Sequence, residues 1–97
     1  MLYKLSIRPL ATLEIIEAYD WYELQKSGLG FQFLSSLDEF YNKLLINPLT
    51  HSFYDNPIRQ GTLHKFPYII VYEVFDAEII VYSVFMAKRN PAGMRTF

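Results

Sequence analysis

The chain has 97 residues, of which 52% are hydrophobic and 20% are charged, and its formal net charge is −1. This composition is that of a single globular domain with one small core, and it excludes a disordered chain. The absence of cysteine excludes disulfides, thiolate metal sites and cysteine nucleophiles. A dedicated nucleic-acid binder is usually far more basic; here only residues 86–97, with three cations and no acid, form a basic edge.

We expect a cytoplasmic protein that does not enter a membrane. The N-terminal MLYKLSIRPL is too short and too charged to contain the apolar core of a signal peptide. No apolar run approaches the ~20 residues that a membrane span needs.

The first half of the chain predicts a strand followed by a helix. Residues 2–8 alternate apolar and polar side chains as a half-buried strand does, and Pro9 ends that strand because proline cannot donate to a sheet ladder. Thr12 is expected to cap a helix that extends from Leu13 to Lys26. Gly28 suits the left-handed position that ends many helices.

A second helix is predicted from about Leu29 to Asn47, because a stripe of large apolar residues recurs there at helical spacing (Phe33, Leu37, Phe40 and Leu44). Pro48 ends this helix by restricting the residue before it. The connection between the two helices is short, which predicts an antiparallel αα-hairpin.

The second half of the chain predicts strands. Residues 48–58 are irregular, and Phe53 and Tyr54 there either pack inward or begin a short strand. Residues 61–66 are expected to form a strand and Pro67 a bend. Two long runs of β-branched and aromatic residues, 68–75 and 79–86, follow with a three-residue break between them, which is typical of an antiparallel hairpin.

The predicted order is β-α-α-β-β-β in one domain, residues 1–97. We expect an α+β fold of two layers, in which an antiparallel sheet packs on the αα-hairpin. The long strands are apolar on both alternating faces, and helices can cover only one of them. The other face is then open and aromatic or covered by a partner chain.

The ends of the long hairpin carry cations. In an antiparallel pair, the start of the first strand and the end of the second lie at the same end of the sheet. Lys65, Lys88 and Arg89 are therefore expected at one rim, with Arg59 nearby if its strand pairs alongside.

Several segments occur in an order that resembles the RelE/ParE superfamily, the toxins (plasmid stabilisation proteins) of bacterial type II toxin–antitoxin modules. The segments are AYDWYE (18–23), Gly28–Leu29–Gly30, Ile46–Asn47–Pro48, Arg59, KFPYIIVYEV (65–74) and KRNP (88–91). The resemblance implies the same β-α-α-β-β-β order and a cognate antitoxin that lies across the toxin surface. It implies one of two activities, either RelE-like cleavage of mRNA on the ribosome or ParE-like inhibition of DNA gyrase, without a cofactor.

The resemblance also suggests which residues act. Arg59 and Arg89 match positions that are basic in many relatives, and Lys65 precedes the P-Y strand where basic residues are common. In an RNA-cleaving enzyme the arginines would stabilise the charge on the phosphorane, with Lys65 assisting. Without the resemblance, these cations are more simply read as the solvated ends of strands.

The proton-transfer group of such an enzyme is missing from the motif. Met86 stands where many relatives have a histidine, which favours a ParE-like activity without chemistry. His64 is adjacent to Lys65, so on a strand the two side chains would point to opposite faces, and we interpret His64 as a surface residue.

A degenerate homologue that retains antitoxin binding but not toxicity is the alternative, and a homodimer stays open beside a toxin–antitoxin assembly. We expect no metal, since His51 and His64 match no metal-binding spacing. The acidic residues of the first helix are read as a solvated face (Glu14, Glu17, Asp20 and Glu23).

Overall fold

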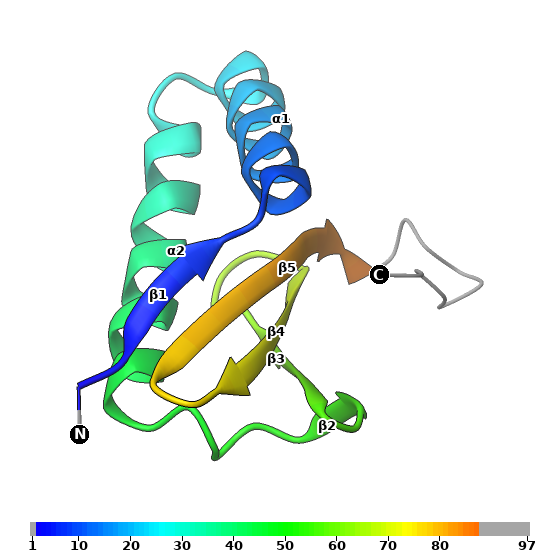
Figure 1. The fold of residues 1–97 in the computed structure, drawn as a ribbon. Helices are drawn as coiled ribbons and strands as arrows, with labels where there is room; N and C mark the ends of the chain where they lie inside the picture. The colour runs from blue at the N-terminus through cyan, green and yellow to red at the C-terminus, as the bar shows by residue number, and fades with distance from the viewer. Residues whose placement is uncertain (1, 88–97) are drawn as a thin grey trace.

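The computed structural model describes residues 2–87 and has two layers, a helix pair and a five-stranded sheet (Figure 1). The elements are β1 (Lys4–Ile7), α1 (Pro9–Gln25), α2 (Leu29–Ile46), β2 (Phe53–Asp55), β3 (Ile58–Thr62), β4 (Tyr68–Phe75) and β5 (Glu78–Met86). The strand order is β1-β5-β4-β3-β2. The α+β two-layer fold is confirmed, but the sheet is mixed, because β1 pairs with β5 in parallel while the other pairs are antiparallel. Neither helix in this described part is long and apolar enough to cross a membrane.

The first helix begins at Pro9, three residues before the predicted cap. Arg8 occupies the N-cap position in an extended conformation, and no side chain caps the helix. The N–H of Thr12 donates to the carbonyl of Arg8 at 3.0 Å, so Thr12 lies within the first turn. Proline suits that turn because its ring fixes φ near the helical value and its missing N–H would have no partner there. The prediction that Thr12 caps the helix is therefore wrong.

The turn between the helices is held by Glu23. Its carboxylate accepts hydrogen bonds from the N–H of Gly28 (3.0 and 3.2 Å to the two oxygens) and from the N–H of Gly30 at 2.8 Å. Gly28 has a φ of +90°, the left-handed conformation expected there. A Cβ on Gly30 would lie 2.8 Å from the carbonyl oxygen of Tyr19, so glycine is what lets the two helices approach this closely. Glu23 is not part of a solvated face.

The core lies between the helices and one face of the sheet. On β4, Tyr68, Ile70 and Tyr72 are buried and belong to the same cluster as the apolar stripe of α2. The rings of Phe33 and Tyr68 are 5.0 Å apart at their centroids. The other alternating face of β4 points away from both helices. We call it the open face.

The strand before β4 lies three residues earlier than predicted. We expected residues 61–66, whereas β3 is Ile58–Thr62 and the chain bends before Tyr68. Gly61 is buried in β3, and a Cβ there would lie 2.6 Å from the Phe40 ring, so the sheet touches α2 at this glycine. The short strand β2 precedes β3 after a turn with a cis Asn56–Pro57 peptide bond.

Candidate functional site

Arg59 lies in the middle of the sheet and not at its rim. Its strand neighbour on β4 is Tyr72, four residues from Tyr68, where the predicted rim begins. At about 3.3 Å per residue this places Arg59 ~13 Å from the rim along the strand. The geometry does not bring Arg59 close to Lys65.

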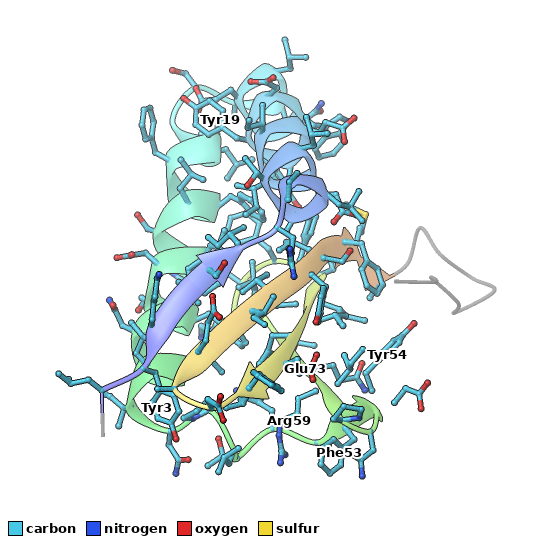
Figure 2. All side chains as sticks on the ribbon, viewed as in Figure 1. Tyr3, Tyr19, Phe53, Tyr54, Arg59 and Glu73 are labelled. Carbon is cyan, nitrogen blue, oxygen red and sulfur yellow. The ribbon has the colours of Figure 1, made fainter. Side chains whose placement is uncertain are left out.

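The Arg59 side chain is occupied by backbone contacts. Its guanidinium donates to the carbonyls of Leu49 (3.2 Å) and His51 (2.6 Å) and lies 4.1 Å from the centroid of the Phe53 ring. Figure 2 shows Arg59 and Phe53 beside each other next to β2. These contacts hold residues 49–51, the irregular segment that follows α2, against the sheet.

Tyr72 holds the same segment from β4. Its hydroxyl donates to the carbonyl of Pro48 at 2.7 Å, and the residue is fully buried. Burial raises the pKa of Tyr72 to about 12, although the positive charge of Arg59 opposes this, so the phenol stays protonated and remains a donor. Arg59 and Tyr72 thus form one anchor for the segment, which sequence reasoning did not find because the partners are backbone carbonyls.

Lys65 and His64 lie in the bend between β3 and β4, and both are exposed. Because neither residue is on a strand, the expectation that their side chains point to opposite faces does not apply. The N–H of Ala87 donates to the carbonyl of Pro67 at 2.8 Å, so the end of β5 meets this bend. Lys88 and Arg89 lie outside the described residues.

On the open face, the three central strands β3, β4 and β5 carry apolar, neutral polar and acidic side chains. Residues opposite one another in an antiparallel pair share a face. Strand register and alternation from Ile69 and Val71 place one set of side chains on it: Ile58, Gln60, Thr62, Ile69, Val71, Glu73, Phe75, Glu78, Ile80, Ser83 and Phe85. No lysine or arginine is among them. The described cations at this face, Lys4 and Arg8, come from β1 and the residue after it.

One polar cluster crosses the open face. The Tyr82 hydroxyl donates to a carboxylate oxygen of Glu73 at 2.7 Å, and the Arg8 guanidinium lies 6.0 Å from the centroid of the Tyr82 ring. The hydrogen bond to Glu73, together with burial, raises the pKa of Tyr82. A phenol held in this way serves as a hydrogen-bonding group, and it does not supply a proton readily at neutral pH.

The carboxylate of Glu14 binds the edge of β5 beyond the point where β1 ends. Glu14 on α1 accepts hydrogen bonds from the Ser83 hydroxyl (2.7 Å) and from the Val84 N–H (2.9 Å). An unpaired strand edge is a template for pairing with another chain, and Glu14 occupies that position here. Like Glu23, Glu14 does not belong to a solvated face.

The outer surface of the helix pair carries an apolar hollow of about 340 Å³. It is lined by Ile15, Ile16, Tyr19, Phe31 and Leu34, and we call it the helix-pair groove. Ile16 and Phe31 are 51% and 61% exposed. The Tyr19 and Phe31 rings meet edge to face at 5.4 Å, so both helices contribute to the groove.

His51 lies beside the anchor that Arg59 and Tyr72 form. Its ring lies 5.3 Å from that of Phe40 and 6.1 Å from that of Tyr72. Burial and the nearby positive charge of Arg59 lower the pKa of His51. Within residues 2–87, no three or more His, Asp or Glu side chains gather in a way that would hold a metal ion.

Comparison with known proteins shows similarity in structure and not in sequence. No protein-family model matches the chain, and no curated protein matches it. A solved structure of the chromosomal ParDE toxin–antitoxin system from P. aeruginosa matches with a TM-score of 0.76 and 17% identity, over 88% of this chain and 96% of that one.

Two E. coli structures are also similar. The intact RelBE toxin–antitoxin complex matches with a TM-score of 0.65 and 22% identity, over 88% of this chain and 96% of that one. A mutant of the toxin RelE in the free state matches with a TM-score of 0.58 and 21% identity, over 94% of this chain and 90% of that one. The chain therefore has the fold of the RelE and ParE toxins.

Proposed function

We propose that the chain is the toxin of a type II toxin–antitoxin module and that it inhibits growth by binding a protein, in the manner of ParE-like toxins that block DNA gyrase. The fold supports the toxin role. The open face supports the choice between the two activities, because the described side chains that β3, β4 and β5 place on it include no lysine or arginine.

Cleavage of RNA is the activity that this face supports least. An RNA-cleaving site needs cations that hold phosphates and stabilise the charge of the phosphorane. Glu73 and Glu78 are instead the charged side chains of β4 and β5 on this face. The described cations beside them, Lys4 and Arg8, lie next to these acids, so the face offers a phosphate backbone no group of cations free of acids. An apolar surface with few charges is typical of a protein interface.

The antitoxin is proposed to bind the helix-pair groove. An amphipathic helix recognises its partner by laying apolar side chains into a groove of this kind. The groove is apolar throughout, and two of its five lining side chains are more than half exposed. Leu13, which is 60% exposed at the start of the same helix, would extend the contact.

The three cations of the candidate site take different roles in this proposal. Lys65 is exposed, and with Arg89 it is proposed to contact an acidic part of the target. Arg59 is proposed to act through the 49–51 segment that it anchors. The catalytic role expected for all three residues stays a prediction, tested by substituting Arg59 and Arg89 together.

The proposal is tested by inducing the protein in a bacterial host without its antitoxin. Phe75→Glu/Ile80→Glu places two acids on the open face, while Ile46→Glu changes an apolar residue of α2 that is 83% exposed. We expect growth arrest with the parent and with Ile46→Glu, and growth with the open-face variant, provided that thermal unfolding shows all three to be folded. Arrest by the open-face variant would contradict the proposed surface. Growth with the folded parent would contradict the toxin role and leave the non-toxic homologue.

A further inference from the structure

Tyr82 lies in a β-bulge between β4 and β5. The two strands pair Val71 with Ser83 but Tyr72 with Val81, so Tyr82 is the extra residue of β5 between these pairs. A bulge interrupts the alternation of a strand and re-aims a side chain, and bulges are common beside functional sites. Here the bulge directs the phenol onto the open face.

Two charged side chains contact this phenol. Its hydroxyl donates to a carboxylate oxygen of Glu73 at 2.7 Å, which fixes the orientation of the ring. The guanidinium of Arg8 lies 6.0 Å from the centroid of the ring, at the outer limit of a cation–π contact. Arg8 is exposed, whereas Tyr82 and Glu73 are half-buried. The arrangement presents an accessible guanidinium beside a ring that a carboxylate holds in place.

The position of Arg8 favours an anion as its partner. Arg8 is the N-cap residue of α1, no side chain caps the helix there, and the first turn contains no acid. The positive end of the helix dipole therefore adds to the charge of the guanidinium. The guanidinium is planar and presents a fork of donors that matches the two oxygens of a carboxylate.

The surroundings of this cluster are apolar. Ile80 pairs with Glu73, and Phe75 lies two residues further along β4 on the same face. Phe75 is 61% exposed. A partner that covers these side chains removes water, and a charge pair then interacts more strongly than on an open surface. Tyrosine and arginine are also enriched among the residues that dominate the energy of protein interfaces.

We propose that Arg8 binds a carboxylate of the target protein, from an aspartate or glutamate bordered by apolar side chains, and that Tyr82 and Glu73 position its guanidinium. This inference rests on the proposed function, because it names the chemistry that the open face recognises. An acidic group fits better than a cationic one, since Arg8 is exposed while Glu73 already accepts the hydrogen bond from Tyr82.

The experiment measures how much of the protein is needed to arrest growth. The parent and its variants are induced over a range of inducer concentrations without antitoxin, and the protein level at half-maximal arrest is read by immunoblot. Arg8→Met removes the guanidinium, and we expect it to raise that level at least ~10-fold, which corresponds to about 1.4 kcal/mol of binding. Lys4→Met is the matched control, an exposed cation on the same face about 13 Å away along the strand, and should act like the parent.

Arg8→Lys retains the charge but not the fork, and should fall between the parent and Arg8→Met. It decides the test if thermal unfolding shows that Arg8→Met is not folded. Equal arrest by the parent and the folded Arg8 variants would overturn this inference alone. Growth with the folded parent would overturn the proposed function and the inference with it. Cleaved mRNA in cells arrested by the parent, absent with Arg8→Met, would show that Arg8 binds phosphate and not a carboxylate.

A double-mutant cycle tests the positioning role of Tyr82. Tyr82→Phe keeps the ring but removes the hydrogen bond to Glu73. It should raise the level needed for arrest several-fold in the parent and have no further effect in Arg8→Met, because the two residues act through one contact. A purely structural Tyr82 would raise the level by the same factor in both backgrounds, and that result would refute the positioning role.

Discussion

Replacing Glu23 by alanine should destabilise the protein more than its position on a helix surface suggests. The carboxylate accepts hydrogen bonds from two backbone N–H groups at the turn, those of Gly28 and Gly30. Gly30 is buried, so its N–H would lose its acceptor in a place that water reaches poorly. The negative charge also lies at the N-terminal end of α2, where the helix dipole stabilises it.

The magnitude follows from these contacts. A hydrogen bond to a charged group contributes about 1.5–3 kcal/mol, and the lower end applies here because the turn is only partly buried. Because alanine is itself a good helix former, helix propensity adds no cost. We expect the free energy of unfolding to fall by about 2–3 kcal/mol, which for a chain of this size lowers the melting temperature by roughly 10–20 °C.

Urea denaturation followed by circular dichroism measures the effect. Glu23→Gln retains one acceptor oxygen and should fall between the parent and Glu23→Ala. Glu17→Ala is the matched control, an exposed glutamate earlier on the same helix. If Glu23→Ala and Glu17→Ala differ by less than about 0.5 kcal/mol, the usual range of surface substitutions, the turn does not depend on this carboxylate.

Three further predictions concern other close contacts. Gly30→Ala should lower the free energy of unfolding by about 1–3 kcal/mol, because its Cβ would meet backbone that cannot move aside, and equal stability in urea would refute this. Tyr72→Phe should cost about 1–2 kcal/mol by leaving the Pro48 carbonyl without its donor, and should speed proteolysis near residue 49; an unchanged cleavage pattern would argue against the anchor. His51 should make the protein less stable as the pH falls through 6.5, its ordinary pKa, since the unfolded chain then binds a proton that the folded chain resists. Thermal unfolding between about pH 7.5 and pH 5.5 checks this, and His51→Gln should lose that part of the pH dependence.

The helices and the long hairpin were predictable from the sequence because their patterns are long and periodic. The apolar stripe of α2 and the β-branched runs of β4 and β5 each repeat several times, so single exceptions do not obscure them. The start of α1 was not predictable from the sequence, because Pro9 both ends a strand and begins a helix. The position of β3 was missed because Ile58–Thr62 has no clear alternation, and its place is set by pairing with β4.

The candidate site was less predictable than the fold. Arg59 was expected near the rim, but its position depends on a strand register that local sequence does not specify. Glu14 was read as solvated because its partners, Ser83 and Val84, are 69 and 70 residues away in the chain. Lys65 is exposed as a contact residue should be, while Arg89 lies outside the described residues and keeps its proposed role from the sequence alone.

The central claim is that the protein stops growth by binding a protein target and not by cutting RNA. Pulse labelling of new DNA and new protein after induction without antitoxin tests this most directly, with mRNA integrity followed in the same cells beside an Arg59→Ala/Arg89→Ala variant. We expect DNA synthesis to fall first while translation and mRNA remain intact. A prompt fall in protein synthesis with cleaved mRNA, absent from the variant, would contradict the claim and establish the ribosome-dependent nuclease in its place.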